Sequence, residues 1–137
     1  MRRKGKKYKY RRSKEAGRGV IPNRVDIDQR PLIVDEKRRV GDYELDTIVG
    51  AHHKGAILSI VKKRTKLTKL MLISTGTADN ISRAIVQSLW PIKQFVHTLT
   101  SDNGKEFSGH QSVAKTLDAV FFFAKPYRAC ERGLNEN

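Results

Sequence analysis

Three acidic residues alternate within the string GDYELDTIVG, which begins at residue 41. In an extended strand successive side chains point to opposite faces, so Asp42, Glu44 and Asp46 share one face. Carboxylates this close repel one another unless cations lie between them. The pattern therefore predicts either a cation site or the solvated acidic edge that many strands have.

Two more acidic residues occur where functional groups often gather. Asp102 directly follows a predicted strand, within the sequence SDNG, and loops after strands commonly carry sites in mixed α/β sheets. Glu136 lies in a predicted helix near the end of the sequence. Taken singly, Asp102 is also compatible with a plain turn, and Glu136 with an exposed helical residue.

Taken together, these acidic residues predict a metal site that none of them would indicate alone. Asp46, Asp102 and Glu136 can meet if the first and fourth strands are neighbours and a helix returns after the fifth. Three carboxylates at one point attract hard divalent cations, chiefly Mg²⁺ or Mn²⁺. Two such ions about 4 Å apart can activate a water or a 3′-hydroxyl and stabilise the leaving oxygen of a phosphodiester. These three residues are therefore the predicted catalytic and metal-binding set.

The elements that would position this set follow from periodicity and chain breakers. Strands are expected at residues 43–49, 56–61, 70–73, 95–100 and 119–124. Helices are expected from Thr77, as N-cap, to Trp90, then at 110–117, and from about residue 132. A three-stranded meander followed by alternating helices and strands predicts an α/β fold with a ribonuclease H-like mixed sheet.

The charge of the chain points to a polyanion. With 28 basic and 14 acidic residues the net charge is +14, which favours nucleic acid as the partner over an anionic membrane. Residues 1–40 hold 15 of the basic residues against 5 acidic ones. Residues 1–14 hold nine basic residues and no acid, typical of an extended nucleic-acid-binding arm or of a solvated or ribosome-binding tail. The expected DNA-binding residues are Arg2, Arg3, Lys4, Lys6, Lys7, Lys9, Arg11, Arg12 and Lys105.

Composition also suggests how the chain is divided. The glycines and prolines of residues 15–40 favour a linker, so we expect a basic arm and linker at 1–40 and a partial catalytic core at 41–137. The single cysteine, Cys130, excludes an internal disulfide, and the apolar runs are too short to span a bilayer. We therefore expect a soluble intracellular protein.

Some residues outside this set have structural interpretations. Trp90 and the run Phe121–Phe123 are expected in the core. The basic residues near the second hairpin turn, Lys62, Lys63, Arg64 and Lys66, would either grip phosphates or keep the hairpin soluble. Glu106 is interpreted as a helix-start residue rather than a ligand.

Three strings carry a resemblance to a known family. GDYELDTIVG resembles the first-aspartate motif of the IS-thirty family of bacterial insertion-sequence transposases, and LTSDNGKEF resembles the second. PYRACERGLNEN resembles the segment that ends in the catalytic glutamate, and GRGVIPNRVDIDQRP the stretch before the core. The 33 residues between Asp102 and Glu136 match the separation typical of this DDE group.

The resemblance covers about residues 17–137 and implies a ribonuclease H-like integrase core with two Mg²⁺ or Mn²⁺ ions. It implies cleavage and strand transfer of DNA at element ends, with Asp46, Asp102 and Glu136 in the catalytic positions. The implied partners are the element ends and target DNA, and the implied assembly is a homo-oligomer.

The chain also departs from the family pattern. The family usually has tryptophan where this chain has Tyr43 and Cys130. The sequence stops one residue after Glu136 and lacks the family's N-terminal helix-turn-helix domain, so we expect a transposase fragment that is inactive alone. The alternatives are a non-catalytic basic nucleic-acid-binding protein, which explains the charge but not the carboxylate spacing, and a ribonuclease H-like nuclease.

Overall fold

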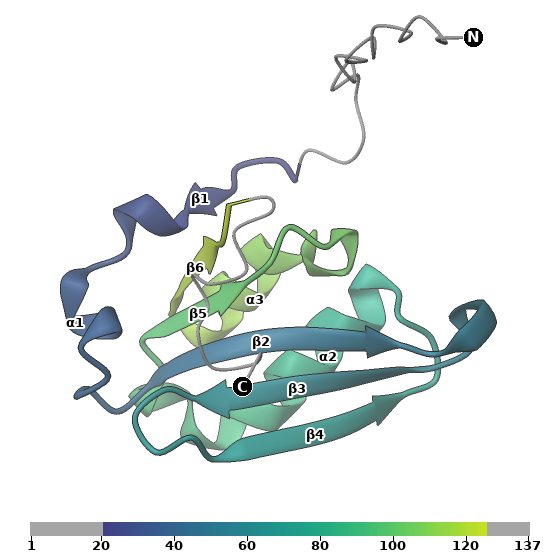
Figure 1. The fold of residues 1–137 in the computed structure, drawn as a ribbon, viewed down its shortest axis with the longest axis horizontal. Coiled ribbons are helices and arrows are strands. Elements are labelled where there is room, and N and C mark those ends of the chain that lie inside the picture. The colour runs from purple at the N-terminus through teal and green to yellow at the C-terminus, as the bar shows by residue number, and fades with distance from the viewer. Residues whose placement is uncertain (1–20, 126–137) are drawn as a thin grey trace, which may run out of the picture.

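The fold of the computed structural model, which describes residues 21–125, is shown in Figure 1. Within these residues one mixed sheet has the strand order β1-β6-β5-β2-β3-β4. The first three long strands, β2 (Asp42–Val49), β3 (Ala56–Lys62) and β4 (Thr68–Ile73), form the predicted antiparallel meander.

The other half of the sheet is parallel. β5 (Thr98–Ser101) pairs with β2, and β6 (Val120–Phe123) pairs with β5. The short β1 (Val25–Asp26) completes this edge by pairing with β6. The expected α/β ribonuclease H-like sheet, with the first and fourth predicted strands as neighbours, is confirmed.

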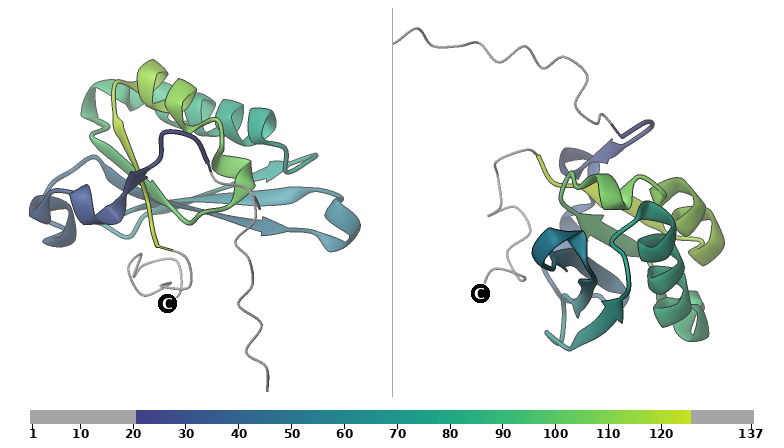
Figure 2. Two further views of the ribbon diagram at one scale, coloured as in Figure 1. Left: turned by 90° about the horizontal axis from the view of Figure 1, so that it is seen from above. Right: turned by 90° about the vertical axis from the view of Figure 1, so that its right-hand side faces the viewer.

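Two helices cover one face of the sheet, as the two views in Figure 2 show. They are α2 (Ala78–Leu89) and α3 (His110–Leu117), close to the predicted bounds. Thr77 caps α2 as expected, because its hydroxyl accepts the Asn80 N–H at 3.4 Å. Between the helices and the sheet lies an apolar core. Its residues that are at most 1% exposed include Leu45, Leu58, Ile81, Ile85, Leu99, Phe107, Leu117 and Phe123.

The connection between α2 and β5 differs from the prediction. Pro91 has no N–H for an α-helical bond, so the chain continues from α2 as the 3-10 helix η3 (Trp90–Phe95). β5 therefore starts at Thr98 and not at residue 95. The prediction that Trp90 lies in the core is wrong: it is 51% exposed, and Lys93 Nζ lies 4.3 Å from its ring centroid. The expected burial of Phe121–Phe123 is confirmed.

Part of the expected linker packs against the core. β1 uses the edge of β6, whose backbone groups would otherwise lack sheet partners. It leads through the 3-10 turn η1 (Ile27–Gln29) into the one-turn helix α1 (Leu32–Asp35), whose Val34 is fully buried. The glycines and prolines that suggested a linker therefore interrupt regular structure without detaching these residues from the sheet.

Two further 3-10 turns, η2 (Ala51–His53) and η4 (Lys105–Phe107), lie in the β2–β3 hairpin and after β5. Gly41, directly before β2, has φ +104° and packs so tightly that a Cβ there would overlap the Phe95 carbonyl oxygen. The start of β2 is thereby held against the end of η3.

Candidate active site

The parallel pairing of β2 with β5 sets the positions of the two predicted aspartates. Asp42 is opposite Thr98, and Glu44 is opposite Thr100. The pairing ends there, and Asp46 and Asp102 each lie two residues beyond the last pair, Asp102 directly after β5. Tyr43 and Leu45 belong to the core under the helices, so the acidic side chains project from the opposite face of the sheet.

Both aspartates are partly buried, and backbone N–H groups hold their carboxylates. Asp46 Oδ1 accepts the N–H of Thr47 at 2.9 Å. Asp102 Oδ1 accepts the N–H of Gly104 at 2.9 Å, which is the side-chain-to-backbone bond of an Asx turn. The SDNG sequence is therefore a turn, as predicted, and the turn also orients a carboxylate.

A contact that the sequence did not predict joins β2 to the turn after β5. Thr47 Oγ1 donates a hydrogen bond of 2.5 Å to Glu106 Oε1, from η4. The Glu106 carboxylate lies against Gly104, where a Cβ would overlap it. Glu106 does lie in the first turn of η4, as interpreted, but it also ties the residue after Asp46 to the loop after Asp102.

Closer to the start of β2, the carboxylates have cationic partners. Asp42 is 1% exposed, and its Oδ1 accepts from Arg39 Nη2 at 2.7 Å and from the Thr98 hydroxyl at 2.7 Å. Burial raises the pKa of the neighbouring Tyr43 phenol, and the negative charge of Asp42 raises it further.

Glu44 forms a buried ion pair. Its Oε1 lies 2.5 Å from Lys63 Nζ, and the side chains of Glu44 and Lys63 are 0% and 2% exposed. Beside them Arg30, 7% exposed, donates to the Thr100 hydroxyl at 3.1 Å and pairs with Asp35. Lys63 is thus neither a phosphate contact nor a solubilising residue, because it neutralises a buried carboxylate. The repulsion expected along the strand is relieved by the chain's own cations.

The remaining predicted site residues lie away from β2 or outside the described part of the chain. Lys105 is exposed in η4, three residues after Asp102. Glu136, Cys130 and the predicted DNA-binding residues of the arm lie outside the described residues. Within residues 21–125 no three histidine, cysteine, aspartate or glutamate side chains form a group that could hold a metal ion.

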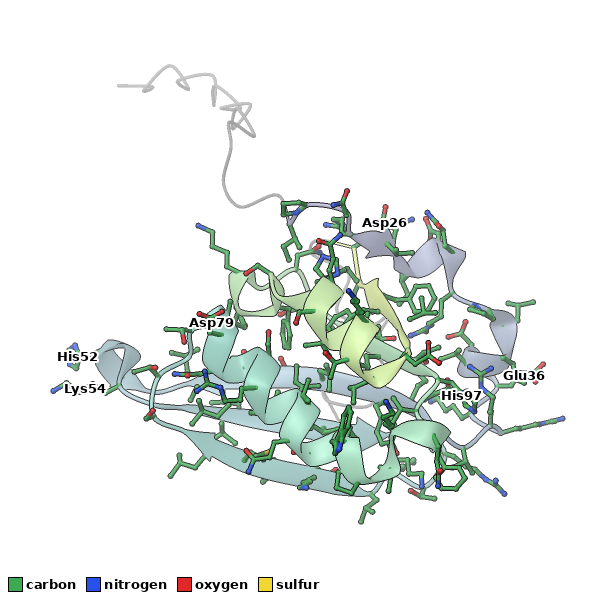
Figure 3. The ribbon with its side chains drawn as sticks, turned by 180° about the vertical axis from the view of Figure 1, so that it is seen from behind. Asp26, Glu36, His52, Lys54, Asp79 and His97 are labelled. Carbon is green, nitrogen blue, oxygen red and sulfur yellow. The ribbon has the colours of Figure 1, made fainter. Side chains whose placement is uncertain are left out.

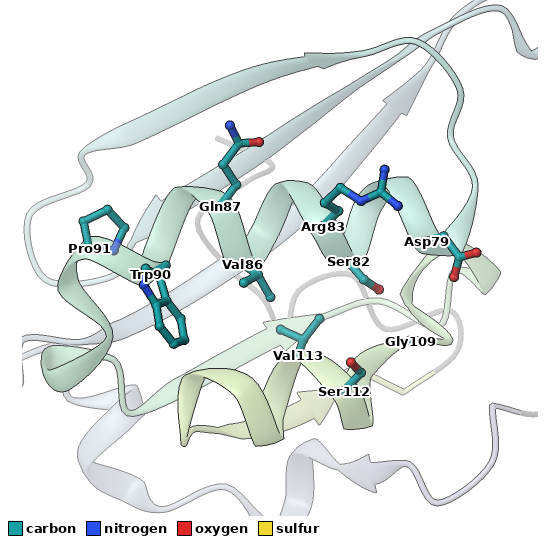
Figure 4. A pocket seen from close by; sticks show the side chains of 10 residues that line it. All are labelled: Asp79, Ser82, Arg83, Val86, Gln87, Trp90, Pro91, Gly109, Ser112 and Val113. Atoms are coloured by element: carbon teal, nitrogen blue, oxygen red, sulfur yellow. The ribbon is translucent and has the colours of Figure 1, made fainter.

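A separate groove of about 680 Å³ lies between α2 and α3. Figure 4 shows Asp79 and Arg83 toward one end and Trp90 toward the other, with Val86 and Val113 between. These helices cover the sheet face opposite to the acidic side chains of β2, so the groove is not part of the candidate active site. No helix among the described residues is long and apolar enough to cross a membrane.

The chain is similar to several transposases. It is 49% identical, over all of its 137 residues, to the transposase for insertion sequence element IS4351 of Bacteroides fragilis, of which it spans 42%. It is 33% identical over 115 residues, 81% of its length, to a probable transposase for the element IS1161 of Streptococcus salivarius, of which these cover 32%. It is 23% identical over 130 residues, 94% of its length, to the transposase InsI for IS30A of Escherichia coli, of which they cover 34%.

Solved structures agree with the fold. The catalytic core domain of BIV integrase matches with a TM-score of 0.56 and 25% identity, covering 69% of this chain and 61% of that one. A chain of a simian T-cell lymphotropic virus intasome matches with a TM-score of 0.61 and 13% identity, covering 72% of this chain and 36% of that one. No family model matches the chain.

These likenesses favour a transposase over a ribonuclease H-like nuclease or a non-catalytic binding protein. The chain spans less than half of the transposases that it matches. Over that span it has the mixed α/β sheet of a retroviral integrase core, and it resembles the IS-thirty family of insertion-sequence transposases.

Proposed function

We propose that this chain carries part of the active site of a DNA transposase, which cleaves the ends of a mobile element and joins them to target DNA. Asp46, Asp102 and Glu136 are the proposed catalytic residues. The observation that supports the proposal is the β2–β5 register, with Asp42 opposite Thr98 and Glu44 opposite Thr100. Extended by two residues, this register would set Asp46 opposite Asp102. The whole-length likeness to insertion-sequence transposases supports the same assignment.

The donor groups fit hard divalent cations. Mg²⁺ and Mn²⁺ prefer carboxylate oxygens, and Asp46 and Asp102 present carboxylates that backbone N–H groups already orient. We propose that these two residues, with Glu136, hold two such ions. When bound, the ions would activate a water or 3′-hydroxyl and stabilise the leaving oxygen of a phosphodiester. The role of Thr47 and Gly104 is to keep the carboxylates in one orientation.

DNA is the proposed partner. Lys105 is exposed close to Asp102 and is suited to contact a phosphate beside the site. The basic residues of 1–14 would add contacts without sequence preference, because neutralising phosphates releases counterions. Assembly of several copies on the DNA is part of the proposal, and the mass of the DNA complex in solution would test it.

The proposal can be tested with a DNA-nicking and strand-transfer assay in Mn²⁺. Because the chain spans 42% of its Bacteroides relative, the assay would use a version extended to that relative's length. Asp46→Asn, Asp102→Asn and Glu136→Gln should each reduce both reactions to background. The matched control is Asp118→Asn, at an exposed left-handed position (φ 52°) that asparagine also tolerates. Nicking by Asp46→Asn at the rate of the control would refute the assignment.

A further inference from the structure

Basic side chains gather at the end of the sheet opposite Asp46 and Asp102. The Lys63 N–H donates to the Asp42 carbonyl oxygen at 2.9 Å, which places the β3–β4 turn beside the start of β2. The His97 N–H donates to the Gly41 carbonyl oxygen at 2.8 Å, so the end of η3 joins the same region. Figure 3 shows Glu36 and His97 near one another at this end, with His52 and Lys54 at the other.

We call this region the basic end and define it by six residues: Lys37, Arg38, Lys62, Arg64, Lys66 and Lys93. All are exposed except Lys62, which is half-buried. Among the described residues none of the six forms an ion pair. Of the acidic residues nearby, Asp42 and Glu44 are buried and paired with Arg39 and Lys63. Asp35 and Glu36 are exposed, and Asp35 pairs with Arg30.

Two of these lysines have a backbone conformation that their residue type disfavours. Lys37 has φ 56° and Lys66 has φ 61°, both in the left-handed region. In that region a Cβ is close to the following carbonyl oxygen, so glycine, asparagine and aspartate are the usual residues. Asn23 and Asp118 follow that preference, whereas the two lysines do not. Residues in a backbone conformation that their type disfavours often have a function, and here both residues are cations.

We infer that the basic end is a second phosphate-binding surface for duplex DNA, separate from the site at Asp46 and Asp102. The inference deepens the proposed function and rests on it for DNA as the polyanion. Cations that gather at one end of the sheet repel one another in the free protein, and a phosphate backbone would neutralise them while releasing its own counterions. The buried pairs Arg39–Asp42 and Lys63–Glu44 lie between the two surfaces, so the positive charge of the basic end is not continuous with the acidic site.

The test uses the full chain, a mixed-sequence DNA duplex and EDTA in place of divalent metal. The variant carries Lys37→Gly and Lys66→Gly, which remove two charges and supply the residue that the left-handed backbone favours. We expect the slope of log affinity against log salt to become shallower by about 1.8, since each lost phosphate contact accounts for about 0.9. The midpoint of thermal unfolding should not fall.

The matched control carries Arg83→Gln and Lys115→Gln, which remove the same charge from the helix layer. Its salt slope should equal that of the unmodified chain. An unchanged slope in the lysine variant, or an equal change in the control, would overturn the inference, the latter because only net charge would then matter. Since binding is measured without metal, this result is independent of the nicking assay that tests the proposed function.

Discussion

Carboxylate side chains differ in burial between the first and second halves of β2, although they lie on the same face of the strand. At the start of β2, Asp42 and Glu44 are at most 1% exposed and pair with Arg39 and Lys63. Two residues further along, Asp46 is partly exposed and accepts a backbone N–H, as Asp102 does directly after β5. The acidic run is therefore structural at the start of β2, and metal binding is proposed for its partly exposed part.

A buried carboxylate and a metal-binding carboxylate need different surroundings. A buried carboxylate must be paired, because an isolated charge loses its hydration without compensation. A metal-binding carboxylate needs a fixed orientation and access to solvent, and a backbone N–H supplies the first without neutralising the charge. The buried half can therefore serve as a rigid base for the partly exposed half, and the following predictions test that difference in burial.

The largest effect on stability should come from breaking the buried ion pair. Lys63→Met leaves the Glu44 carboxylate buried without its cation, which typically costs about 3–5 kcal/mol of unfolding free energy. Urea denaturation would measure it. The double variant Glu44→Leu, Lys63→Met should recover most of the loss, since a buried pair can often be replaced by apolar groups. A double variant as unstable as the single one would show that the pair itself is required.

A smaller loss should follow from removing the hydroxyl that supports Asp42. Thr98→Val removes a 2.7 Å hydrogen bond to a buried carboxylate, and bonds to charged groups contribute about 1.5–3 kcal/mol. Beside the partly exposed half of β2, Ser59→Ala removes only a 3.4 Å contact to the Asp46 carbonyl oxygen. It should cost less than about 0.5 kcal/mol of unfolding free energy. Equal losses in the two variants would contradict the distinction between the halves.

The bond between Thr47 and Glu106 should matter more for metal than for folding. Thr47→Val should lower stability by only about 1 kcal/mol, the usual contribution of one hydrogen bond. It should weaken Mn²⁺ binding by about 10-fold, because the hydroxyl ties the residue after Asp46 to the loop after Asp102 while the N–H that holds Asp46 is kept. Glu106→Gln should behave similarly, and the double variant should add little. Additive effects of the two changes would show that the residues act separately.

The smallest effect should be a dependence of stability on alkaline pH. The pKa of Tyr43 is raised in the folded protein, so the unfolded chain loses its phenol proton first, near pH 10. The stability associated with Tyr43 is present below that pH and is lost as the pH rises toward the folded pKa. Tyr43→Phe should therefore lose less stability between pH 9 and pH 11 than the unmodified chain. Parallel losses in both proteins would rule out a contribution from Tyr43.

Much of the fold was accessible from the sequence because its signals are local. The alternation in β2, the Thr77 cap and the apolar spacing of α2 are set by residues a few positions apart, and the structure confirms them. β1 was not predicted, because two residues have no periodicity and become a strand only beside β6. The start of β5 was misplaced because η3 continues past Pro91.

The candidate site also has features that the sequence could predict and contacts that it could not. The pairing of β2 with β5, on which the proposed meeting of Asp46 and Asp102 depends, follows from strand order, which a sequence pattern can suggest. The Glu44–Lys63 pair could not be foreseen, because lysines beside a turn are normally solvated and only the packed fold buries this one. The Thr47–Glu106 bond likewise joins residues 59 positions apart and has no local signature.

The most direct test of the account is a Mn²⁺ titration of the 137-residue chain, followed by electron paramagnetic resonance. Asp46→Asn and Asp102→Asn should each weaken binding by more than the roughly 10-fold that loss of a supporting partner costs, while both variants stay folded. Asp118→Asn should bind as the unmodified chain does. Unchanged Mn²⁺ affinity in both aspartate variants would contradict the claim that Asp46 and Asp102 form one metal site.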